Sequence, residues 1–186
     1  NLQDYPELII PLPGETVENH RKSLRDVVDT LGMNNVDVHQ LAMLRGSEMA
    51  TRSHRKLMGI ETRYRMFVGC LGIYGVGDEL VPCAEVEETA VSNKTMSFEE
   101  YLDCRTLDFL VKVFIDNDPF REVFGVVRKL GLSAVDILLE MRQTHIPKYP
   151  ALVSLLDEFV TRTKSPMYNS LKELDAVLAK ENYIQN

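Results

Sequence analysis

A strand pattern that runs directly into a turn and a helix start, at residues 7–16, most strongly constrains the fold of this chain. Leu8–Leu12 is apolar throughout, which is typical of a parallel strand covered on both faces. Pro13-Gly14 then turns the chain, and Thr16 can cap a helix whose apolar residues recur at helical spacing as far as Leu31. The segment therefore predicts a strand–turn–helix junction of an α/β fold.

A second strand is predicted after this helix. Val36 and Val38 alternate with polar residues in the stretch 35–43, which is the pattern of a strand with two distinct faces. Two strands with an amphipathic helix between them favour a right-handed parallel crossover over residues 7–43. The chain begins at Asn1 rather than at methionine, so we expect its start to be an excised boundary within a longer protein.

The second half of the chain carries helical patterns. Ser97 followed by Glu100 is a capping box, and the wide apolar stripe that follows it predicts a helix over residues 97–116. Residues 64–91, by contrast, are rich in glycine and indicate a strand or two with long connections. Further helices are predicted near residues 119–130, 133–143, 150–163 and 168–181.

Composition excludes several classes of function. A net charge of -7 with dispersed basic residues disfavours nucleic acid as a partner. No apolar run approaches the roughly 20 residues that span a bilayer. Cys70, Cys83 and Cys104 are widely spaced and form neither an even disulfide framework nor a Cys-x-x-Cys pair. We therefore expect a cytoplasmic protein that binds neither nucleic acid nor a membrane.

Three segments, in order, resemble radical S-adenosylmethionine (radical SAM) enzymes. Glu7-Leu-Ile-Ile-Pro-Leu-Pro-Gly-Glu-Thr16 is similar to the Asp-Leu-Ile-x-Gly-Leu-Pro-Gly-Glu-Thr segment of that family, and Leu44-Arg-Gly-Ser-Glu-Met49 is similar to its Leu-x-Pro-Gly-Thr-x-Leu turn. Residues 85–105, including Ser97-Phe-Glu-Glu-Tyr-Leu102, resemble the tail of the subset with a cobalamin-binding domain before the barrel. Pro11 replaces the family's usual glycine, which argues against close backbone approach of a ligand there.

The resemblance implies a fold class and a set of cofactors. We expect an α/β, mainly helical chain, with the terminal βα units of a partial barrel in residues 1–92 and a C-terminal helical bundle in residues 93–186. The full-length protein would use S-adenosylmethionine, a [4Fe-4S] cluster that cleaves it to a 5′-deoxyadenosyl radical and, in the matching subset, cobalamin. The Cys-x-x-x-Cys-x-x-Cys motif for that cluster is absent. We therefore expect the chain to be inactive alone, without a catalytic or metal-binding residue or a bound cofactor of its own.

Four residues are candidates for binding. Glu7 falls where the family often has an acid that contacts the cofactor ribose, although a solvent-facing strand end is the alternative. His39 and Gln40 point to opposite faces of their strand. Gln40 is assigned to the cofactor, through its adenine edge, or to a substrate, and His39 to a substrate or to a backbone carbonyl. Arg45, in the second matched segment, is assigned to the substrate.

Two charged groups have a functional and a structural interpretation. They are the arginines at positions 52, 55, 63 and 65, and the glutamates at positions 85, 87 and 88. The arginines could hold an anionic substrate, but such a run is more often a solvated helix face. The glutamates could pair as general acid and base, but they also fit a solvent-facing strand.

The leading functional hypothesis is the C-terminal portion of a radical SAM oxidoreductase or methyltransferase. This portion would shape the substrate side of the barrel, with the upstream part of the same polypeptide as its partner. Unpaired edges of an incomplete parallel sheet also favour a homodimer. The alternatives are a non-catalytic helical interaction module in residues 97–186 and a small α/β enzyme with its own pocket.

Overall fold

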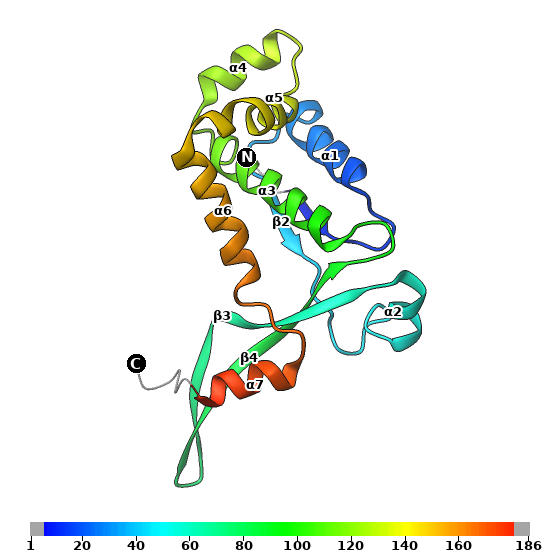
Figure 1. The fold of residues 1–186 in the computed structure, drawn as a ribbon, viewed down its shortest axis with the longest axis vertical. Helices are drawn as coiled ribbons and strands as arrows, with labels where there is room; N and C mark the ends of the chain where they lie inside the picture. The colour runs from blue at the N-terminus through cyan, green and yellow to red at the C-terminus, as the bar shows by residue number, and fades with distance from the viewer. Residues whose placement is uncertain (1–5, 181–186) are drawn as a thin grey trace, which may run out of the picture.

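The computed structural model describes residues 6–180 of the chain (Figure 1). The strands are β1 (Glu7–Ile10), β2 (Asp37–Gln40), β3 (Glu61–Val76) and β4 (Glu79–Ser92). The helices are α1 (Val17–Arg25), α2 (Arg52–Met58), α3 (Phe98–Phe114), α4 (Arg121–Lys129), α5 (Ala134–Glu140), α6 (Pro150–Lys164) and α7 (Leu171–Lys180). Within residues 6–180, no helix combines the length and the apolar composition that crossing a bilayer requires.

β1 and β2 form a parallel pair with α1 between them, as the sequence predicts. In their register Glu7 lies opposite Asp37, and Ile10 lies opposite Gln40. The helix begins at the expected place, because the side chain of Thr16 accepts a hydrogen bond from the backbone N–H of Asn19. The β-α-β unit is therefore present in the first forty residues.

The two faces of this small sheet differ. Leu8, Ile10 and Val38 point to one face and pack against apolar residues of α1 and α3. The opposite face carries the exposed side chains of Glu7, Ile9, Asp37 and His39. Strands of a parallel sheet are normally covered on both faces. The described residues thus leave one face of the β1–β2 sheet bare.

The expected partial barrel is wrong. β3 and β4 do not extend the parallel sheet, but form a separate antiparallel pair that projects from the rest of the fold as a long hairpin (Figure 1). The physical reason is the connection between them, since only Gly77 and Asp78 separate the two strands. Two residues can join antiparallel neighbours, whereas parallel strands need a crossover of a dozen or more.

The segment that follows β2, residues 41–43, links the two sheets. The N–H of Ala90 donates to the carbonyl of Leu41 at 2.9 Å, and the N–H of Met43 donates to the carbonyl of Glu88 at 2.7 Å. At the far edge of the hairpin, Tyr64 and Tyr168 exchange two backbone hydrogen bonds of 2.8 Å. The hairpin therefore lies between the end of the β-α-β unit and the chain that leads into α7.

The expected C-terminal helical bundle is also wrong. α3 packs against α1, α5 and α6, whereas α7 lies on the hairpin against β3 (Figure 1). The reason is that the apolar face of α3 covers the β1–β2 sheet and α1 instead of closing a core with the later helices alone. The largest core cluster comprises Leu24, Val27, Val28, Val36, Leu107, Leu110, Val111, Ile115, Phe124, Val127, Ala134, Val135, Leu138 and Ile146.

A buried charged network joins α1, α3 and β2. The side chains of His20 and Asp108 are almost fully buried, and His20 Nε2 lies 2.7 Å from Asp108 Oδ1. Arg105 Nη1 donates to Asp108 Oδ2 at 3.3 Å and to the backbone carbonyl of Val38 at 3.2 Å. On its other side, His20 Nδ1 lies 3.5 Å from Glu15 Oε1. The network fixes β2 and the turn after β1 against the two helices.

The charge state of His20 follows from these neighbours. Burial alone lowers the pKa of an imidazole, because it disfavours the charged form. Hydrogen bonding to Asp108 and the contact with Glu15 outweigh burial and raise the pKa of His20 to about 9. His20 is therefore a buried imidazolium at neutral pH, held between two carboxylates.

Candidate functional site

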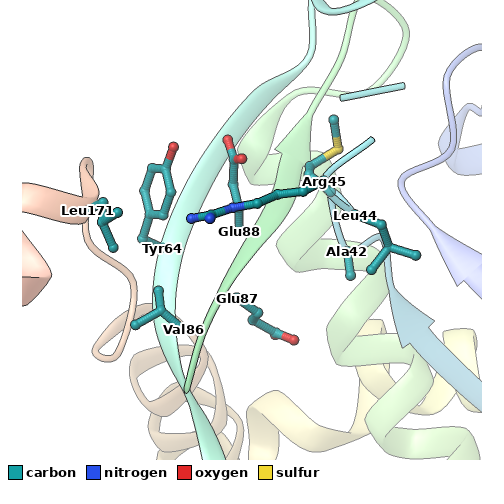
Figure 2. Close-up of a pocket in the computed structure, with 9 residues that line it drawn as sticks. Ala42, Leu44, Arg45, Tyr64, Val86, Glu87, Glu88 and Leu171 are labelled. Atoms are coloured by element: carbon teal, nitrogen blue, oxygen red, sulfur yellow. The ribbon is translucent and has the colours of Figure 1, made fainter. Parts of the chain in front are cut away.

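A pocket of about 360 Å³ lies where the segment after β2, the hairpin and α7 meet (Figure 2). It is lined by Ala42, Met43, Leu44, Arg45, Tyr64, Val86, Glu87, Glu88 and Leu171. Its volume lies within the range of small-molecule sites. Because its walls come from four segments far apart in the sequence, the pocket exists only once the hairpin has packed against residues 41–43 and α7.

Glu88 is held at the pocket wall by Arg55 of α2. The guanidinium contacts both carboxylate oxygens, Nη1 on Oε1 and Nη2 on Oε2, the second at 2.8 Å. The hydroxyl of Thr62 donates to Oε1 at 2.6 Å. The hydrogen bonds from Arg55 lower the pKa of Glu88 more than burial raises it. Glu88 is therefore an ionised carboxylate with a hydrogen-bond donor on each of its oxygens.

Glu87 is paired across the hairpin with Arg65. The two residues lie opposite each other in the β3–β4 register, and Nε and Nη2 of Arg65 both contact Glu87 Oε1. The hydroxyl of Thr89 donates to the same oxygen at 3.1 Å. Each glutamate of the pocket thus has its own arginine. This arrangement suits binding and orientation of a ligand better than proton transfer by a free carboxylate.

Arg45 enters the pocket from the segment after β2. Figure 2 shows its side chain extending towards Tyr64 and Glu88. In the part of the chain that the structure describes, its guanidinium takes part in no ion pair and no hydrogen bond. Burial, followed by the nearby Glu88 charge, raises the pKa of Tyr64, so its hydroxyl stays protonated at neutral pH. Arg45 is thus an uncompensated positive charge beside neutral and already paired groups.

The structure distributes the four predicted binding residues over three places. Arg45 lines the pocket. Glu7 and His39 lie together on the bare face of the β1–β2 sheet, with His39 Nε2 3.8 Å from Glu7 Oε1. Gln40 lies on the opposite face, where its buried Oε1 has no hydrogen-bond partner among residues 6–180. Glu7 and Gln40 therefore do not converge on one cofactor site.

The thiols of this chain do not fit an iron–sulfur cluster. Cys104 is buried in α3, where burial raises its pKa to about 12, and Cys70 and Cys83 lie on the two strands of the hairpin. Across residues 6–180, no group of three or more His, Cys, Asp or Glu side chains is placed to hold a metal ion. Cluster chemistry would need ligands from outside this chain.

The sequence patterns did not indicate Tyr64 as a site residue, and they offered Glu87 and Glu88 only as a possible acid–base pair, without a pocket. The interpretation of the arginines as one helix face is wrong, because Arg52 and Arg55 lie on α2 but Arg63 and Arg65 lie on β3. Arg55 pairs with Glu88, and Arg65 pairs with Glu87. The two-residue loop Gly77-Asp78 is typical of a β-hairpin and could have revealed that β3 and β4 pair. It could not have revealed the pocket pairs, because residues 64–66 lie opposite residues 86–88 only after a register shift between Met66 and Leu71.

Neither a protein-family model nor a curated protein sequence matches this chain. Two features of the structure therefore bear most directly on function. They are the pocket around Arg45 and the bare face of the β1–β2 sheet.

Proposed function

We propose that this chain is the substrate-side part of a radical SAM enzyme and acts with a polypeptide segment outside this sequence that supplies the cluster ligands. The observation that carries the proposal is the parallel β1–α1–β2 unit, which is covered by α1 and α3 on one face only. The motif resemblance supports it. Residues 7–16 form the strand, turn and helix start, and residues 44–49 form the turn beside the pocket.

The bare face needs a covering element. Ile9 is 42% exposed although it lies on a parallel strand, between Glu7 and the neighbouring His39. Parallel sheets are usually buried on both faces, and unpaired strand edges attract further strands. In the proposed enzyme the outside segment covers this face. Glu7 and His39 then lie in the contact with that segment.

The role of this chain is binding and orientation. The arginine-paired glutamates fix the pocket wall, and the α7 residue Leu171 closes one side of it. Such a site holds a substrate and excludes water while the outside segment supplies the reactive group.

A non-catalytic helical interaction module is the second candidate, and one observation favours it. Three apolar side chains along α4 are exposed. They are Val123 (58%), Val126 (56%) and Leu130 (68%), the last of which directly follows the helix. Their spacing places them on one side of the helix. An exposed apolar stripe of this kind is typical of a docking surface for another protein.

Co-purification with the outside segment separates the two candidates. The chain should be co-expressed with the polypeptide encoded immediately upstream of it, and the upstream part captured through an affinity tag. Ile9→Asp is expected to reduce recovery of this chain at least tenfold, because it buries an unpaired charge in the proposed contact. Val123→Asp is the matched control and is expected to leave recovery unchanged. The reverse result would favour the helical module.

Activity of the assembly provides the second readout. After anaerobic reconstitution with iron and sulfide, and with dithionite as reductant, the two-part assembly is expected to release 5′-deoxyadenosine from S-adenosylmethionine. This chain alone is expected to release none, because its thiols do not form a cluster site. An assembly that co-purifies but binds no iron would contradict the proposed enzyme.

A further inference from the structure

Around the pocket there is one more arginine than there are glutamates. Glu88 is neutralised by Arg55 and Glu87 by Arg65. Arg45 has no such partner among residues 6–180. Arg45 is an exposed residue of the pocket lining, so solvent screens its charge in part. Counted with Arg55 and Arg65, the pocket still has one more arginine than glutamate, which suits an anion.

The two carboxylates of the wall do not cancel this preference. The guanidinium of Arg55 spans both oxygens of Glu88, with Nη2 2.8 Å from Oε2, and Thr62 occupies a further acceptor position. The forks of Arg55 and Arg65 are directed at their own glutamates, so they are not available to a ligand. Arg45 is the guanidinium that remains to form two parallel hydrogen bonds with an incoming oxyanion.

The side of the pocket towards which Arg45 extends carries apolar groups beside the paired Glu88 carboxylate. Figure 2 shows Val86 and Leu171 there, together with the ring of Tyr64. A ligand that meets the Arg45 guanidinium at one end thus meets aliphatic and aromatic carbon at the other. The pattern is that of many ligand sites, in which apolar walls supply area and one or two polar groups fix orientation.

We propose that this pocket binds a small molecule with a carboxylate or phosphate oxyanion held by Arg45 and an apolar part against Val86 and Leu171. The inference names the substrate class of the proposed enzyme, and it rests on that function only in taking this pocket as the substrate site. Its volume of about 360 Å³ admits such a molecule.

Binding of probes with matched alkyl chains tests this inference on the isolated chain. Hexanoate, hexylammonium and 1-hexanol are titrated into the labelled protein, and amide chemical shifts are followed by NMR. Hexanoate is expected to bind tightest and to move signals of the pocket residues. Arg45→Gln is expected to weaken its binding by about tenfold or more, the loss of one charge-assisted interaction. Arg52→Gln, at an exposed arginine of α2, is the matched control and should bind as the unaltered chain does.

The outcomes are distinct. Equal binding of hexylammonium, or unchanged hexanoate binding by a folded Arg45→Gln protein, would overturn the inference. Competition by inorganic phosphate separates the two kinds of oxyanion. Displacement of bound hexanoate by phosphate indicates a phosphate ligand, and no displacement indicates a carboxylate ligand. Hexanoate binding without 5′-deoxyadenosine release from the assembly would keep the pocket and reject the proposed enzyme. Release of 5′-deoxyadenosine without hexanoate binding would keep the proposed enzyme and reject the inference about the pocket.

Discussion

Replacing Asp108 by asparagine is expected to lower the free energy of unfolding by about 3–5 kcal/mol. The Asp108 side chain is only 5% exposed, lies 2.7 Å from His20 Nε2 and also accepts from Arg105. Asparagine keeps the shape of the side chain but removes its negative charge, so Arg105 loses its carboxylate partner and buried His20 keeps only the more distant Glu15. Urea unfolding at pH 6, followed by circular dichroism, measures the change.

Asp136→Asn is the matched control for this prediction. Asp136 also pairs with an arginine of α1, Arg25, at 2.8 Å, but its side chain is 56% exposed. Exposed ion pairs contribute at most about 1 kcal/mol, because solvent and salt screen them. Equal losses at Asp108 and Asp136 would contradict a special role for the buried network.

The free energy of unfolding is also expected to fall by ~3 kcal/mol between pH 6.5 and pH 9. In the folded chain the pKa of His20 is raised from 6.5 to about 9. Over this range the folded state keeps a proton that the unfolded chain releases. The stabilisation is complete below pH 6.5 and is lost as the pH rises through 9. Urea unfolding at regular pH intervals measures the slope.

Two variants identify the group that titrates. His20→Gln removes the imidazole and should remove most of the slope, leaving the part near pH 9 that comes from the buried Cys104 thiol. Asp108→Asn removes its main counter-charge and should reduce the slope. A chain with His20→Gln that keeps the full pH dependence would show that another group causes it and would contradict the buried imidazolium.

Local sequence patterns predicted the helix starts, because these depend on residues that are neighbours in the sequence. Thr16 caps α1 through the N–H of Asn19, and the capping box of Ser97 and Glu100 starts α3. These signals act within one helical turn, so the sequence alone contains them. The strands on either side of α1 were also predictable, because their parallel pairing follows from the length of the crossover.

Arrangements that depend on distant residues were not predictable in this way. His20 lies on the inner stripe of α1, but its partner Asp108 is 88 residues away. Glu88 lies on an alternating strand, but its burial and its pairing with Arg55 depend on how α2 docks on the hairpin. Gln40 was assigned to a cofactor, and its placement in the interior depends on which face α3 covers. Periodicity specifies that a face is apolar, not what will cover it.

The prediction of a partial barrel was wrong for a related reason. The parallel unit at residues 7–40 suggested that the next strands would continue the same pattern. The short Gly77-Asp78 connection instead pairs β3 with β4, and this hairpin also builds the pocket around Arg45. The turn chemistry of two residues thus outweighed the pattern of the preceding segment.

The coding sequence directly upstream of Asn1 tests whether this chain is part of a radical SAM enzyme. If this chain is the substrate-side part of a radical SAM enzyme, the same reading frame continues upstream and encodes Cys-x-x-x-Cys-x-x-Cys after a predicted strand, because the cluster needs those three thiolates. An upstream frame without this motif would contradict the account.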